Sequence, residues 1–178
     1  MEQERNSVES PEQGPSEMVV AVEAYLAEQA GWLEAAHERI HRVYPDGALW
    51  WGESGSRLTG EEIARHAEAA VRYLEAEGWA PRASAEERFA AYDAKHGHNF
   101  RVVLPPQDLF LALFRTARTD DVLYRLGTVL NSLLLVSTGA PSVRYQDWDT
   151  HPDRTLREVR EVLVAAAAYA RRYGPPAP

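Results

Sequence analysis

Apolar residues recur at intervals of three and four along most of this 178-residue chain, which is the pattern of amphipathic helices. The clearest run is the last one, with apolar positions at Leu156, Val159, Leu163, Ala166, Ala170 and Tyr173. Thr155 and Glu158 stand three residues apart ahead of this run as a capping box, and Gly174-Pro175 follows it. The pattern therefore predicts a final helix over residues 155–173.

The same reasoning predicts further helices upstream. We expect them over residues 16–43, 59–77, 108–117 and 119–138, with a short one at 84–95. Thr59 with Glu62 is another capping box, and Gly139 is the expected end of the 119–138 helix. That helix is apolar on most sides, so we place it at the centre, packed against the final helix. In the 108–117 helix the residues expected to face inward are Leu109, Phe110, Leu113 and Phe114.

Short segments with strand-like composition interrupt the helices. Residues 99–104 and 143–148 are expected to pair as a small two-stranded ribbon, the first ending at Pro105-Pro106. Residues 48–51 and 57–58 flank a Gly/Ser loop and indicate a brief hairpin. Successive side chains of a strand point to opposite faces, so we expect either Trp50 or Trp51 to be half exposed.

Length and composition fit one globular domain, since 45% of the residues are apolar and 26% are charged. Residues 1–15 are polar and acidic and have too little apolar surface to order, so we expect a disordered tail. The predicted fold is mainly α, a single-domain bundle of five or six helices with a minor two-stranded β element. We assign this domain to residues 16–174, followed by a tail at 175–178.

Charge and cysteine content exclude several function classes. The formal net charge of −8 argues against nucleic acid, because a phosphate-binding surface needs a basic face. The sequence has no signal-peptide core and no apolar run near the roughly 20 residues that span a bilayer, so we expect no membrane contact. The chain has no cysteine, which fits a cytoplasmic protein and leaves only His and carboxylate ligands for any metal.

The sharpest chemical signal is His37-Glu38-Arg39-Ile40-His41, which matches the metalloprotease pattern His-Glu-x-x-His. On a helix the two imidazoles share a face and can bind zinc, while Glu38 activates a bound water. However, a helix precedes the motif, Arg39 interrupts it, and no third ligand has a recognised spacing. The other interpretation is that His37 and His41 are ordinary, partly buried histidines. We expect no metal and no catalytic residue, with zinc at His37 and His41 and catalysis by Glu38 as the alternative.

Asp147, Asp149 and His151 alternate, so extended chain would place them on one face, where they could hold a divalent cation. Carboxylates ahead of a helix N-terminus also stabilise its positive end. We adopt the second interpretation, in which these carboxylates stabilise the start of the final helix rather than bind a cation.

The segment Trp148-Asp149-x-x-Pro152-x-Arg154-Thr155-x-x-Glu158-Val159 resembles the C-terminal signature of a family of uncharacterised small actinobacterial and phage proteins. In that family the pattern reads Trp-Asn-Asp-x-Pro-x-Arg-Thr-x-x-Glu-Val, so Asp149 and Thr150 depart from it. The Ala-rich helix that ends at Gly78-Trp79 is also similar. The resemblance covers the last two-thirds or so of the chain and implies no activity.

We therefore predict a non-enzymatic binding or regulatory module that acts through a protein partner or self-association. The alternative is a zinc-dependent hydrolase that uses the His37-Glu38-x-x-His41 motif. Exposed indoles are typical of binding surfaces, so the candidate binding residues are Trp50, Trp51 and Trp148. Trp148 is expected to be buried beside the start of the final helix, and it becomes a binding candidate if it is exposed.

Overall fold

The computed structural model describes residues 17–81 and 108–177, without the side chains of residues 17–27 and 29. Its helices are α1 (Glu17–Val43), the 3-10 helix η1 (Pro45–Trp50), α2 (Gly60–Glu77), α4 (Leu109–Thr116), α5 (Asp120–Thr138), α6 (Tyr145–Trp148) and α7 (Leu156–Tyr173). The mainly α fold is confirmed, and each long helix predicted in these ranges begins and ends within one residue of expectation. The expected acidic tail at 1–15, short helix at 84–95 and strand at 99–104 lie outside the described residues.

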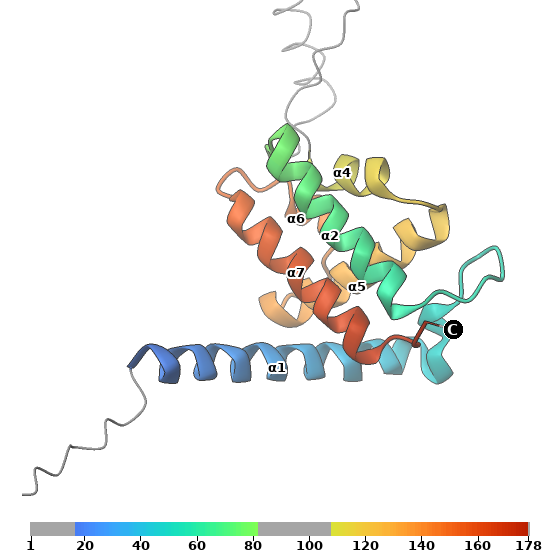
Figure 1. Ribbon diagram of the computed structural model, residues 1–178, viewed down its shortest axis with the longest axis horizontal. Coiled ribbons are helices and arrows are strands. Elements are labelled where there is room, and N and C mark those ends of the chain that lie inside the picture. Colours follow the sequence, from blue (N-terminus) through green and yellow to red (C-terminus); the bar gives the residue numbers. More distant parts are fainter. Residues whose placement is uncertain (1–16, 82–107, 178) are drawn as a thin grey trace, which may run out of the picture.

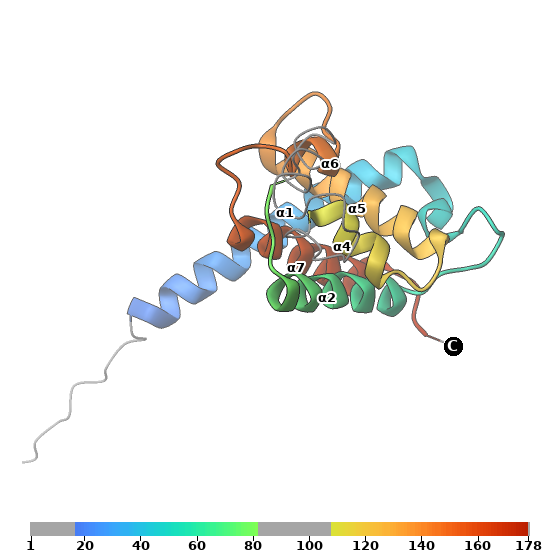
Figure 2. The same cartoon turned by 90° about the horizontal axis from the view of Figure 1, so that it is seen from above.

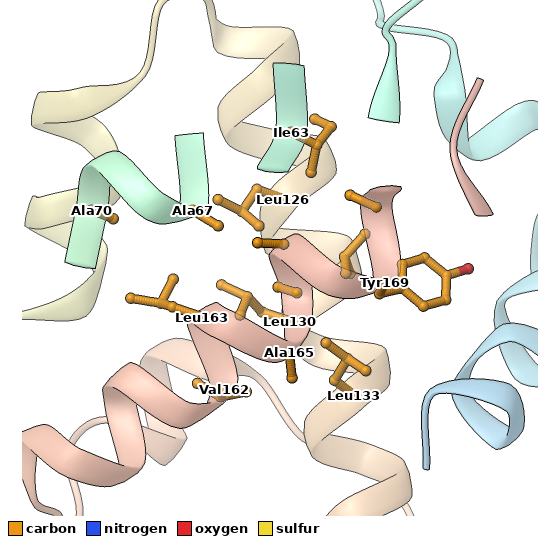
Figure 3. Close-up of a cluster of buried hydrophobic side chains, with 14 of the residues drawn as sticks. Ile63, Ala67, Ala70, Leu126, Leu130, Leu133, Val162, Leu163, Ala165 and Tyr169 are labelled. Carbon is orange, nitrogen blue, oxygen red and sulfur yellow. The ribbon is translucent and has the colours of Figure 1, made fainter. Parts of the chain in front are cut away.

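The long helices pack around α5. Figures 1 and 2 show α2 and α7 side by side in one layer, with α5 behind them and α1 crossing the end of α7. Between α2, α5 and α7 lies a cluster of buried aliphatic side chains, several of which Figure 3 shows: Ile63, Ala67, Leu126, Leu130, Leu133 and Leu163. Burial of each Leu or Ile stabilises the fold by about 1.5–3 kcal/mol. The central position predicted for the apolar 119–138 helix is confirmed.

Both predicted capping boxes are formed. In α2 the Glu62 N–H donates to Thr59 Oγ1 at 3.1 Å, and the Thr59 N–H donates to Glu62 Oε2 at 2.7 Å. In α7 the corresponding bonds between Thr155 and Glu158 are 3.3 Å and 2.8 Å long. These bonds satisfy amide groups that the first helical turn leaves without intrahelical partners, so helix starts follow from a local sequence pattern.

The start of α2 is fastened to the chain just after α7. The Gly60 N–H donates to the Pro175 carbonyl at 2.9 Å. A Cβ atom on Gly60 would lie 2.1 Å from the Ala170 carbonyl oxygen, and one on Gly174 would lie 2.4 Å from Gly60 Cα. Since backbone stands on both sides of the contact, only glycine fits at these two positions.

The predicted strand at 143–148 is wrong, because residues 145–148 form the helical turn α6. The Tyr145 N–H donates to Asn131 Oδ1 at 2.7 Å, and the Trp148 N–H donates to the Arg144 carbonyl at 2.9 Å. A side chain on α5 therefore starts this turn, which strand propensity alone did not indicate. No strand is present in residues 17–81 or 108–177, and the expected two-stranded element is not found there.

The predicted hairpin is reduced to an isolated antiparallel bridge between Trp51 and Arg57. Its first arm is instead the end of η1, which starts at Pro45 and passes through Asp46 and Gly47 with positive φ values of 54° and 75°. These non-helical turn residues make a kink inside η1, and the chain then continues as a tight turn to Trp50.

In α4 the inward-facing residues are Leu109, Ala112 and Leu113, whereas Phe114 is 54% exposed. The prediction that Phe114 faces inward is therefore wrong. At 100° per residue, Phe114 lies well outside the stripe that Leu109 and Leu113 form on this short helix. Its ring stacks on Phe110 instead, with centroids 6.4 Å apart.

Candidate functional site

The His37–His41 segment of α1 lines a pocket of about 340 Å³, which we call the aromatic pocket. Its other walls come from η1 and its flanks, from the 51–58 loop and from the end of α7. The lining residues are His37, Ile40, His41, Tyr44, Gly47, Leu49, Trp50, Arg57, Tyr169, Tyr173, Gly174 and Pro175. The contact between Gly60 and Gly174 holds the end of α7 at this wall.

Stacked rings make a continuous aromatic wall. The His37 and Tyr173 rings are nearly parallel, with centroids 3.9 Å apart and an interplanar angle of 6°. Tyr169 lies against Tyr173 at 5.0 Å and against Trp50 at 6.4 Å. Each such pair contributes roughly 0.5–1.5 kcal/mol beyond its buried area, so the rings also hold one another in place.

A hydrogen bond joins α1 to α7 at this wall, with 3.2 Å between His37 Nδ1 and the Tyr169 hydroxyl oxygen. Figure 3 shows this hydroxyl pointing away from the aliphatic cluster and toward α1. Burial raises the pKa of Tyr169, so its hydroxyl keeps the proton and can donate this bond. Burial, together with the nearby His41, lowers the pKa of His37, so its ring is neutral at pH 7, and the tautomer protonated on Nε2 accepts this bond at Nδ1.

Glu38, the remaining member of the metalloprotease pattern, lies outside the aromatic pocket. It is exposed and has Oε2 at 3.6 Å from Arg42 Nη2. Across residues 17–81 and 108–177, no group of three or more His, Cys, Asp or Glu side chains is placed to hold a metal ion. The fold thus brings His37 and His41 together with tyrosines rather than with a carboxylate.

The candidate tryptophans have three different environments. Trp50 is 7% exposed and lines the aromatic pocket, whereas Trp51 is 49% exposed, so the expected exposure of one of the pair is confirmed. Trp148 is only partly buried, which corrects its expected burial, and the Arg154 guanidinium lies 3.7 Å above its ring centroid. Trp51 and Trp148 both present ring surface, so both remain candidate binding residues.

Asp147, Asp149 and His151 do not share one face, because the chain is helical rather than extended here. Asp149 is fully buried and accepts from Trp79 Nε1 at 3.0 Å and from the Leu109 N–H at 2.7 Å. Asp147 and His151 are exposed. Asp149 therefore joins α6 to the first amide of α4, whereas the structural interpretation expected these carboxylates to stabilise the start of the final helix.

A larger cleft of about 920 Å³ lies beside the aromatic pocket, and Arg57 lines both. It is bounded by the 53–58 loop, α2 and the start of α5, with Arg65, Arg72 and Arg118 in its walls. The loop is held by Asp121, whose Oδ1 accepts the Glu53 N–H at 2.8 Å. Arg57, Arg65 and Arg72 come from one stretch of the chain and Arg118 from the segment before α5, so the cleft forms only when these two parts pack together.

The fold and these cavities define a small mainly α protein with candidate ligand pockets. The chain belongs to the family of unknown function DUF6197, whose family model matches residues 58–169. The match includes both capping boxes and the segment around Asp149, whereas α1 lies ahead of it. No curated protein and no solved structure matches the chain. None of the described helices is long and apolar enough to cross a membrane.

Proposed function

We propose that this chain is a non-enzymatic binding module that acts by self-association, with two copies pairing through α1. The observation that carries this function is the N-terminal part of α1, which runs past the other helices in both views (Figures 1 and 2). In the sequence, the apolar stripe of this helix continues there through Val19, Val22 and Leu26. A helix segment without tertiary packing is marginal in water, so a covering partner would stabilise it.

A second apolar surface adjoins this part of the helix. Where α1 leaves the bundle, the indole N–H of Trp32 donates to the Leu133 carbonyl at 3.1 Å. Trp32 also lines a pocket of about 430 Å³ together with Leu134, Trp148 and Val162. A helix from a second copy that lay in this corner would cover these side chains and extend along the N-terminal part of α1.

Charge along α1 favours a second copy in the antiparallel direction. Its acidic residues are spread from the start of the helix to Glu38, while Arg39 and Arg42 stand near its end and are exposed. Antiparallel pairing would bring the acidic start of one helix toward the basic end of the other. A two-fold symmetric pair uses the same surface twice and therefore closes as a dimer.

The test is the solution mass of the protein, measured by light scattering from about 1 μM to about 100 μM, a range that covers weak dimers. We expect a mass of twice 20.0 kDa at the upper end. Leu26→Glu should give monomers, whereas Ala35→Glu, which adds the same charge at an exposed position of α1, should leave the dimer intact. Circular dichroism would check that both variants stay folded.

Monomeric wild-type protein throughout this range would refute self-association and leave a different protein as the partner of α1. Dimers that persist in Leu26→Glu would place the interface elsewhere.

For the location of the protein we propose the cytoplasm, which the absence of cysteine from the sequence supports.

A further inference from the structure

We propose that the aromatic pocket binds a small aromatic acid, a planar ring that carries one carboxylate. The cavity of about 340 Å³ lies at the lower end of the range for small-molecule sites. Such sites combine apolar and aromatic walls with a few polar groups that orient the ligand. This inference rests on the residues that line the pocket and does not require self-association.

The walls suit a flat ring. Tyr44, Trp50 and Tyr173 line the cavity with aromatic surface, and Ile40 and Leu49 add aliphatic surface. Trp50 and Tyr173 are already held in place by their stacking on Tyr169 and on His37. A planar ligand would therefore meet surfaces that need little further ordering, which lowers the entropic cost of binding.

The charge of the lining selects an anion. None of the twelve lining residues is Asp or Glu, although the chain has 27 acidic residues against 19 Lys and Arg. Arg57 is the cation in the lining, and no carboxylate of the described residues lies within ion-pair distance of it. An arginine fork can bind a carboxylate through two parallel hydrogen bonds.

A second donor belongs to Tyr173, which lines the pocket. The hydroxyl oxygen of Tyr173 is buried and has no hydrogen-bond partner among the described residues. A buried hydroxyl without a partner destabilises the fold, so an acceptor on a ligand would relieve this cost. A carboxylate that meets Arg57 with one oxygen and Tyr173 with the other would satisfy both groups.

The experiment is isothermal titration calorimetry of the full chain with three probes. Indole-3-carboxylate should bind, whereas its neutral isostere indole-3-carboxamide and the non-aromatic cyclohexanecarboxylate should bind at least about tenfold more weakly. Arg57→Gln should weaken indole-3-carboxylate about tenfold or more, because a charge-assisted hydrogen bond is lost. Tyr173→Phe should weaken it by a smaller factor with no loss of melting temperature, since the hydroxyl it removes has no partner among the described residues.

Two control variants test whether binding takes place in the aromatic pocket. Arg157→Gln removes an exposed arginine of α7 outside the pocket and should leave the affinity unchanged. Arg118→Gln changes only the neighbouring cleft, which shares Arg57, and should also have no effect. A loss of affinity with Arg118→Gln but not with Tyr173→Phe would overturn the assignment to the aromatic pocket. So would equal affinity for the acid and the amide, or no binding of indole-3-carboxylate at millimolar concentration.

Discussion

Asp149 connects three parts of the fold, so its replacement by Asn is a sharp test of how α4 and α6 are held. Its Oδ2 accepts the Leu109 N–H at 2.7 Å, which caps the start of α4, and its Oδ1 accepts the Trp79 indole N–H at 3.0 Å. Both partners are donors, so a carboxylate with two acceptor oxygens suits them. Asn offers one oxygen, and its amide group would meet one of the two N–H donors.

We expect Asp149→Asn to lower the free energy of unfolding by about 2–3 kcal/mol. Leaving one buried donor without an acceptor costs about 1–3 kcal/mol. Loss of the negative charge at the N-terminus of α4 adds about 0.3–1 kcal/mol. Asp149→Ala removes both acceptors and should cost more. Asp147→Asn, an exposed neighbour, is the control and should stay within about 0.5 kcal/mol of wild type.

The assay is urea unfolding of a double-mutant cycle with Trp79→Phe, which removes the indole N–H. In the Asp149→Asn variant the remaining carbonyl oxygen should stay with the shorter bond to Leu109, so the new amide group would face Trp79. Trp79→Phe should then cost about 1–2 kcal/mol less in the Asp149→Asn background than in wild type. Additive effects within about 0.3–0.5 kcal/mol would show that the two side chains are not coupled. That result would refute the assignment of Asp149 to this bond.

Further predictions concern the caps, the histidines and Trp148. Thr155→Ala should lower the free energy of unfolding by about 0.5–2 kcal/mol through the lost cap of α7, and Thr155→Ser should restore most of it. Burial lowers the pKa of His66, so the unfolded state binds a proton more readily and stability should fall as the pH drops below the ordinary value of 6.5. His66→Gln should flatten this pH dependence, measured as melting temperature against pH. Purified protein should contain well under one zinc per chain by elemental analysis, and His41→Ala should change stability only modestly, because His41 is exposed. One tightly held zinc, lost together with stability in His41→Ala, would contradict this and revive the hydrolase alternative. Trp148→Ala should cost less than the roughly 3 kcal/mol expected of a fully buried indole, since Trp148 is only partly buried.

Helix boundaries were predictable because their signals are local. Thr59 with Glu62, and Thr155 with Glu158, form capping bonds over three residues, and the structure has both. Gly139 ends α5 in the left-handed conformation, with φ of 64°, as expected for a glycine after a helix. These features need no knowledge of the rest of the fold.

The exposure of one tryptophan was predicted for an incorrect reason. Strand alternation does separate Trp50 from Trp51, but Trp50 is the last residue of a 3-10 helix rather than part of a strand. The prediction was still correct because Trp50 turns into the core at the end of η1, while Trp51 begins the surface bridge to Arg57.

The pockets and the hydrogen bonds of Asp149 were not predictable, because the residues that form them meet only through tertiary packing. His37 and Tyr169 are 132 residues apart and bond across α1 and α7. Trp79 and Asp149 are 70 residues apart, and nothing near either residue indicates the other. The His37–His41 spacing indicated the correct shared face, while the tyrosines that join it come from the far end of the chain.

The contact between Gly60 and the residues after α7 also bears on how the chain folds during synthesis. α2 packs more extensively on α7 than on any other described helix, and 78 residues separate the end of α2 from the start of α7. A ribosome that adds roughly 5–20 residues per second therefore needs several seconds between making α2 and making its main partner. During this delay the apolar face of α2, which includes Ile63 and Leu74, lacks the helix that covers it in the folded protein. We expect that interval to be the stage at which this protein is most prone to aggregate or to engage a chaperone.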